Sequence, residues 1–178
     1  MADLLTDADV GVPTLSPTCG PPAPGVVSSH EVVVFEVAGQ RYGLPAAHVC
    51  ELVRAVAITP LPHAPPVVEG VINVRGRVLP VLDVRARFRL PAKPLELSDH
   101  FIVVSAGPRR VVLHVDRATD LALLDEASIQ APETLGPSAT YVAGVVKLDD
   151  GLMLIHDAAT FLSAAEAASL DEALQAPA

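Results

Sequence analysis

The sequence predicts an all-β protein: two tandem small β-barrels, related by a pseudo-twofold axis and followed by a C-terminal α-helix. Three observations lead to this prediction. Valines cluster in short bursts, such as Val32-Val33-Val34 and Val103-Val104, and branching at Cβ favours strands. Turns rich in Gly and Pro separate these bursts at close spacing, which is typical of small barrels. The same pattern occurs twice along the chain.

Residues 1–29 are expected to form a disordered tail. Five prolines lie there among Thr, Ser, Gly and Ala: Pro13, Pro17, Pro21, Pro22 and Pro24. Such a segment buries too little apolar surface to offset the entropy of ordering, and proline prevents regular strand pairing. The folded domain should therefore span residues 30–162, with a helix and a short tail over 163–178.

The first copy of the repeat, about 32–90, opens with a strand over 32–37. A turn at Ala38-Gly39-Gln40 leads to a strand over 41–44, and residues 46–52 can form a turn or two of helix before another strand. A connection with several prolines follows. The copy resumes with a hairpin over 68–83, which supplies the last strands of the first barrel.

The second copy, about 100–162, has the same order. A strand over 101–104, a turn at Ala106-Gly107-Pro108 and a strand over 110–115 precede a second proline-bearing connection and a hairpin over 142–157. The hairpins match without a gap from Gly70 to Asp83 and from Gly144 to Asp157. The apolar content of both copies predicts a shared interface as well as two interiors.

The C-terminal segment predicts a short helix. Ser163 and Glu166 have the spacing of a capping box, in which each side chain accepts a hydrogen bond from the other residue's backbone N–H. The helix would place Leu170 and Leu174 on one face. Because so few turns are marginal alone in water, we expect this helix to pack on the body.

The charge of the chain argues against nucleic acid and anionic membranes as partners, since the formal net charge is −9. The basic residues nevertheless gather in one stretch whose single acid is Asp83: Arg75, Arg77, Arg85, Arg87, Arg89 and Lys93. This stretch is either the solvated face of strands or a cationic patch for an acidic protein partner. Only Phe88 interrupts it as an aromatic residue, so it lacks the interleaved rings that stack on nucleotide bases.

The expected location is the cytoplasm. No apolar run approaches the roughly 18 residues that cross a bilayer. The acidic start, Met1-Ala2-Asp3, lacks the features of a signal peptide. Cys19 and Cys50 have no metal-ligand or redox spacing, which fits a reducing compartment.

The first hairpin resembles that of the chemotaxis coupling protein family, CheW. Gly70-Val71-Ile72-Asn73-Val74-Arg75-Gly76 and then Leu79-Pro80-Val81-Leu82-Asp83 are similar to the family pattern G-V-x-N-L-R-G followed by a Pro-Val-x-Asp-Leu strand. Residues 34–44, 49–52, 115–121 and 141–144 resemble it too. The resemblance covers roughly residues 31–174.

This resemblance implies two five-stranded, SH3-like barrels, no catalysis and no cofactor. It also implies two partners that bind at once. One is the cytoplasmic tip of a methyl-accepting chemoreceptor, and the other is the regulatory domain of a chemotaxis histidine kinase, itself a homologous double barrel.

Candidate partner-binding residues follow from the same resemblance. Arg75 matches the family arginine tied to receptor binding, and Glu51 and Gly70 match positions at which coupling is sensitive to change. Val49 would line an apolar groove between the barrels in which a receptor helix docks. Gly76 permits the positive φ of a tight hairpin turn, so Arg75 should point outward. Glu51 is expected to be exposed, and Arg75→Ala is expected to fold normally and lose receptor affinity.

Three other functions remain open from the residues. One is a coupling protein of the same fold in another pathway, with surface motility or a second-messenger enzyme as its output. Another is a self-assembling scaffold. The third is an aspartic-protease-like enzyme using Asp83 and Asp157, which are equivalent in the repeat. The enzyme is disfavoured because neither aspartate lies in a Ser/Thr-Gly loop.

The histidines predict no metal site. His100, His114 and His156, with Asp99, Asp116 and Asp157, have no helix or hairpin ligand spacing. His114 and His156 stand where the family has aliphatic residues, and no role for them follows from the sequence.

Overall fold

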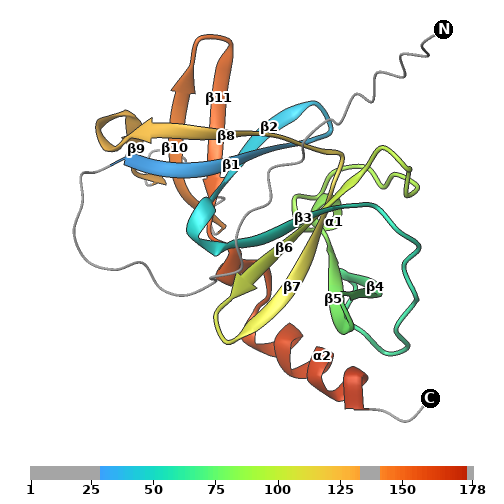
Figure 1. Cartoon of the computed structure of the whole chain (residues 1–178). Coiled ribbons are helices and arrows are strands. Elements are labelled where there is room, and N and C mark those ends of the chain that lie inside the picture. Colours follow the sequence, from blue (N-terminus) through green and yellow to red (C-terminus); the bar gives the residue numbers. More distant parts are fainter. Residues whose placement is uncertain (1–28, 133–140, 176–178) are drawn as a thin grey trace, which may run out of the picture.

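The computed structural model describes residues 29–132 and 141–175, whose strands form two sheets side by side (Figure 1). One sheet has six strands in the order β8-β1-β2-β11-β10-β9, and the other has five in the order β3-β6-β7-β5-β4. The strand bounds are β1 Ser29–Val37, β2 Gln40–Pro45, β3 Val49–Arg54, β4 Val68–Val74, β5 Arg77–Asp83, β6 His100–Ala106, β7 Arg109–Val115, β8 Arg117–Asp125, β9 Ile129–Gln130, β10 Val142–Leu148 and β11 Gly151–His156. The tail expected over 1–29 lies outside the described residues, except that Ser29 opens β1.

The two sheets do not follow the two halves of the sequence. The strands β1 and β2 of the first copy pair with β8 and β11 of the second, while β6 and β7 of the second copy pair with β3 and β5 of the first. Each copy thus gives its first two strands to the sheet that holds the other copy's last hairpin. The ranges expected for the two barrels, about 32–90 and 100–162, do not describe which strands belong together.

The exchange joins equivalent strands by equivalent pairings. β2 runs parallel to β11, with Tyr42 opposite Leu154, and β7 runs parallel to β5, with Leu113 opposite Leu82. Both hairpins carry an irregularity at the same place, between Val68 and Gly70 and between Val142 and Gly144. The internal repeat seen in the sequence is therefore also a repeat of structure.

Buried apolar side chains of the described residues form three clusters. The largest lies between the sheets and includes Phe35 and Leu44 of one sheet and Ile102 and Leu113 of the other. The second cluster covers the opposite face of the six-stranded sheet, and the third covers that of the five-stranded sheet. Alternation along β1 explains this division, because Val32 and Val34 face one cluster while Val33 and Phe35 face the other. The predicted shared interface with two further apolar centres is confirmed.

Short helical turns follow three strands and the longer strand β8. They are η1 Ala46–His48, α1 Val84–Arg87, η2 Glu126–Ser128 and η4 Ala158–Phe161. Asp83 caps α1 by accepting a hydrogen bond from the N–H of Ala86 at 2.9 Å, and Asp157 caps η4 by accepting one from Ala159 at 2.9 Å. The helical turn expected within 46–52 is confined to η1. The repeated aspartates thus have a shared structural use as helix caps.

The C-terminal helix α2, Ala164–Gln175, begins with the predicted capping box (Figure 1). Ser163 Oγ accepts from the N–H of Glu166 at 3.2 Å, and the N–H of Ser163 donates to Glu166 Oε2 at 2.8 Å. Leu170 is fully buried as predicted, but Leu174 is 42 % exposed and Ala173 is buried in its place. The prediction for Leu174 was wrong because the contact face continues from Leu170 at a spacing of three residues and not of four.

Ser163→Ala should lower the free energy of unfolding by about 1 kcal/mol, because the N–H of Glu166 loses its capping acceptor. Urea denaturation followed by circular dichroism would measure the change. Ser163→Thr, which keeps a hydroxyl at the same position, should remain close to the parent protein. Equal stability of the alanine variant and the parent would show that this cap contributes nothing.

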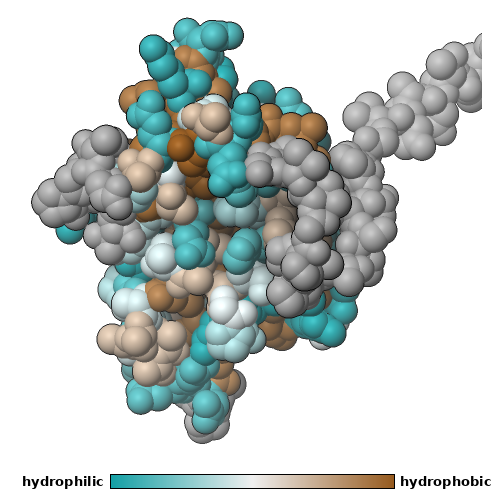
Figure 2. Space-filling view, turned by 90° about the vertical axis from the view of Figure 1, so that its left-hand side faces the viewer, coloured by the Kyte–Doolittle hydropathy of each residue, from teal (hydrophilic) through white to brown (hydrophobic). Residues whose placement is uncertain are grey.

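No helix of the described residues is long and apolar enough to span a bilayer. On the face shown in Figure 2, hydrophobic residues interrupt the polar surface in several small patches.

Candidate partner-binding surface

The tip of the β4–β5 hairpin presents Arg75 to solvent. Val74 pairs with Arg77, so Arg75 and Gly76 form a two-residue loop, with φ of 51° and 81°. Two positive φ values are the requirement of the turn that matches the twist of a hairpin. The N–H of Gly76 donates to Asn73 Oδ1 at 2.8 Å, which fixes the loop, and the Arg75 side chain is 78 % exposed. The predicted outward direction of Arg75 agrees with this geometry.

Arg75 forms an ion pair with Glu51 of β3. Its Nε lies 2.9 Å from Glu51 Oε1 and 3.1 Å from Oε2, and its Nη2 lies 2.8 Å from Oε1. These hydrogen bonds raise the pKa of the Arg75 guanidinium above its ordinary value. Glu51 was expected to be exposed, but its side chain is only 26 % exposed, since the pair draws it against the hairpin. Two residues predicted separately are thus brought into direct contact.

Val49 and Gly70 lie in structural positions. Val49, at the start of β3, is only 8 % exposed and belongs to the apolar cluster between the sheets. Gly70 has a φ of 153°, and a Cβ there would lie 2.2 Å from the carbonyl oxygen of Thr59. The backbone of β4 therefore approaches the Thr59 segment too closely for any side chain.

The cationic stretch is largely neutralised by acidic side chains of the protein itself. Arg75 pairs with Glu51, Arg85 with Asp116, Arg87 with Glu166 and Lys93 with Asp99. For Arg77 and Arg89, no ion pair is found in the described part of the chain. A broad patch for an acidic partner is therefore reduced to individual arginines.

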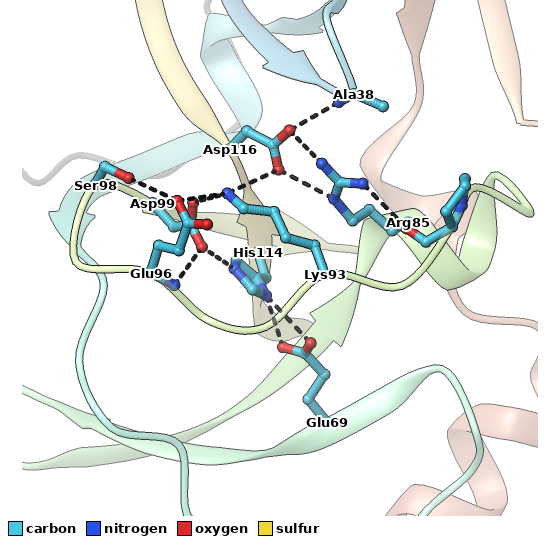
Figure 3. A network of polar contacts seen from close by, with 10 residues as sticks. Ala38, Glu69, Arg85, Lys93, Glu96, Ser98, Asp99, His114 and Asp116 are labelled. Carbon is cyan, nitrogen blue, oxygen red and sulfur yellow. Dashed lines mark hydrogen bonds and ion pairs between the residues drawn. The ribbon is translucent and has the colours of Figure 1, made fainter.

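A polar network centred on His114 joins the two sheets to the segment between the two copies of the repeat (Figure 3). His114 Nδ1 lies 3.0 Å from Glu69 Oε2, and its Nε2 lies 3.1 Å from Asp99 Oδ2. Burial alone would lower the pKa of His114, but the hydrogen bonds with both carboxylates outweigh it and raise that pKa. An imidazolium with a donor toward each carboxylate fits this arrangement.

Asp99 is the fully buried member of the network. It accepts hydrogen bonds from Lys93 Nζ at 2.7 Å and from the N–H of Glu96 at 2.8 Å, besides its contact with His114 (Figure 3). These partners hold the pKa of Asp99 below its ordinary value although burial opposes this. Sequence reasoning missed this cluster, because its members are far apart in the chain and have no motif spacing.

Asp116 continues the network to the six-stranded sheet. Its carboxylate pairs with Arg85 and accepts a hydrogen bond from the N–H of Ala38, in the β1–β2 turn, at 2.8 Å (Figure 3). The network thus holds the connecting segment and both sheets in one arrangement.

His156 lies in an aromatic cluster between the sheets. Its ring centroid is 4.6 Å from that of Phe88, 5.5 Å from that of Tyr42 and 5.8 Å from that of Phe161. Nδ1 lies 2.7 Å from the carbonyl oxygen of Tyr141, so it carries the proton that is donated there. Burial lowers the pKa of His156 to about 4, which makes it a neutral ring.

Neither metal chemistry nor paired-carboxylate chemistry is indicated by the described residues. No group of three or more His, Cys, Asp or Glu among them could hold a metal ion. Asp83 and Asp157 are occupied as helix caps, with no hydrogen bond between them in the described part of the protein.

Comparison with known proteins gives one consistent family. A family model described as "CheW-like domain" matches residues 31–166. The chain is 26 % identical over 142 residues to "Chemotaxis protein CheW" of Treponema pallidum, covering 76 % of this chain and 84 % of that protein. It is 30 % identical over 135 residues to the protein of the same name from Bacillus subtilis, covering 75 % and 86 %.

A solved structure agrees with these matches. The crystal structure of the scaffolding protein TtCheW from Thermoanaerobacter tengcongensis is similar with a TM-score of 0.67 and 32 % sequence identity. The match covers 72 % of this chain and 88 % of that one.

Proposed function

Because this chain belongs to the family of CheW-like domains, we propose that it holds a chemoreceptor and a histidine kinase together in one signalling complex. Chemotaxis coupling and scaffolding, without catalysis, is the function of the family. A scaffold of this kind acts through binding alone: it raises the effective concentration of one partner near the other and lets each bias the other's equilibrium.

The observation that carries the proposal is the Arg75–Glu51 pair at the hairpin tip. The guanidinium is fixed by the acid yet remains largely exposed, so its position is set before a partner arrives. A preorganised arginine loses less side-chain entropy on binding than a free one does, and its planar fork can bond a partner while it holds Glu51.

The partners proposed are the cytoplasmic tip of a methyl-accepting chemoreceptor and the regulatory domain of the kinase. The receptor would contact Arg75 and Glu51 directly. Gly76, Gly70 and Val49 would act by shaping the surface, since Gly76 forms the turn and the other two are buried or crowded. This role would place the protein in the cytoplasm.

We further infer that each sheet curls into a small barrel of the SH3 type. In the six-stranded sheet, β8 and β9 lie at opposite edges although only η2 separates them in the chain. The chain must therefore curve from one edge to the other, and β8 with β9 would act as one bent strand of five. The reciprocal strand exchange supports a pseudo-twofold axis between the two barrels.

Arg75→Ala should weaken binding of the receptor by roughly tenfold or more while leaving the fold intact. Exposed ion pairs contribute little to stability, so circular dichroism and the unfolding midpoint should be unchanged. Calorimetric titration with a receptor fragment identified by pull-down would measure the affinity.

The matched control is Arg77→Ala, which removes a neighbouring arginine with no ion pair among the described residues and should bind normally. Exchanging the charges, in Glu51→Arg with Arg75→Glu, keeps an ion pair but moves the cation. If that double variant binds like the parent, Arg75 acts only by bracing the hairpin and the proposed direct contact is wrong.

A further inference from the structure

A cleft of about 770 Å³ lies beside the aromatic cluster, away from the Arg75 hairpin. Its lining comes from β2 and β11 of the six-stranded sheet, from α1 and the residues after it, and from the start of α2. The residues that matter here are Tyr42, Arg87, Phe88, Arg89, Tyr141 and His156. The volume is in the range of pockets that hold small molecules, and such pockets combine apolar walls with a few placed polar groups.

The walls of the cleft are aromatic. The ring centroids of Tyr42 and Phe88 are 4.8 Å apart, and Phe88 stacks on His156 at 4.6 Å. The guanidinium of Arg87 lies 5.2 Å from the centroid of the Tyr141 ring, which is within cation–π distance. A planar ring that enters the cleft would therefore meet flat surfaces suited to stacking.

The polar groups of the lining are mainly donors. Arg87 donates from Nη2 to Glu166 and from Nη1 to Tyr141, but its buried Nε has no hydrogen-bond partner. Arg89 is exposed, and no ion pair involves it within the described ranges. Because Glu166 offsets only one of the two arginines, the cleft has one positive charge in excess, in a protein whose net charge is −9.

His156 adds an acceptor to the lining. Its side chain is 3 % exposed, and its Nε2 has no partner while Nδ1 donates to the Tyr141 carbonyl. Buried nitrogens without a partner are rare in folded proteins, and two of them line this one cleft. Arg89 also has a φ of 56°, a backbone conformation that a residue other than glycine adopts at some energetic cost.

We propose that this cleft binds a small aromatic anion, a planar ring that carries a carboxylate or phosphate group. The ring lies against Tyr42, Phe88 and Tyr141, and the anionic group is bound by Arg89 and by the Nε of Arg87. A hydrogen-bond donor on the ring completes His156. This inference does not depend on the coupling function, because none of these residues is among those proposed to contact the receptor or the kinase.

The test is titration of the full-length, ¹⁵N-labelled chain with 2-naphthoate, followed by the amide shifts of Tyr42, Phe88 and Tyr141. Two probes separate the parts of the ligand: naphthalene-2-methanol keeps the rings without the charge, and cyclohexanecarboxylate keeps the charge without aromaticity. We expect 2-naphthoate to bind at least tenfold more tightly than either, because each probe lacks one of the two interactions.

Arg89→Gln should weaken 2-naphthoate binding about tenfold, through loss of a charge-assisted hydrogen bond. Arg77→Gln is the matched control, since it removes an exposed arginine outside the cleft and should leave binding unchanged. Absence of shifts with 2-naphthoate, equal binding of cyclohexanecarboxylate, or equal losses in the two variants would each overturn the proposal. The amide spectrum of each variant without ligand reports whether it folds.

Discussion

Gly70→Ala should lower the free energy of unfolding by more than about 3 kcal/mol, the largest effect expected for a single methyl group in this protein. The added Cβ would lie 2.2 Å from the carbonyl oxygen of Thr59 and 2.8 Å from Ile58 Cγ2. Backbone cannot yield as a flexible side chain does, and the φ of 153° is one that alanine rarely adopts. Urea denaturation of the two proteins would measure the difference.

Gly144→Ala is the control that the repeat itself provides. Gly144 occupies the equivalent place in the second hairpin, but a Cβ there would meet the side-chain atom Ile129 Cγ2 at 2.7 Å. Side-chain rotation can relieve that contact, so a loss of about 1–2 kcal/mol is expected. If the two variants lose equal stability, the close backbone approach at Gly70 is not the cause.

The free energy of unfolding should fall by about 3 kcal/mol between pH 6.5 and pH 4 on account of His156. Its pKa is about 4 in the folded protein against 6.5 for the free side chain, and each unit is worth about 1.36 kcal/mol. The unfolded chain therefore takes up the proton first as the pH falls. The stability that neutral His156 provides is complete above pH 6.5 and is lost as the pH falls toward 4. Urea midpoints measured across this range would show the slope.

His156→Leu should abolish that slope. Leucine already stands at the equivalent place in the other hairpin, where Leu82 is fully buried. His114 acts in the opposite sense, since its raised pKa stabilises the fold below pH 6.5 and this contribution is lost as the pH rises. Asp99 and Asp116, with lowered pKa values, affect only more acidic conditions. Parallel profiles for His156→Leu and the parent would contradict the assignment.

The local elements of the fold were predictable because the sequence carries their signals directly. The alternation of apolar residues set the strands, and the loop of Arg75 and Gly76 needs the positive φ that glycine allows. Ser163 and Glu166 announced the start of α2 through their spacing. Each of these features depends on residues that are close in the chain.

The partition of strands between the sheets was not predictable in the same way. Two similar copies can close on themselves or exchange strands with the same local patterns, since β2 can pair with a hairpin of either copy. The pairing of Tyr42 with Leu154 is a choice between equivalent surfaces, and nothing in the spacing of residues decides it.

The candidate site was predicted in part. Arg75 and Glu51 were both identified, but their ion pair and the burial of Glu51 depend on how β3 lies beside the hairpin. His114 and Asp99 were considered only as metal ligands and rejected, because their contact arises from tertiary packing. The signal that could have drawn attention to them is a histidine in an otherwise apolar strand.

The reciprocal pairing of strands has a consequence for synthesis on the ribosome. β1 and β2 are the first strands to emerge, yet β11, beside which β2 lies, ends at His156. The nascent chain must therefore keep an unpaired, valine-rich hairpin available until nearly all of the protein has been translated. A chain cut between the copies should yield two fragments that are each incomplete and that regain structure only when they are mixed.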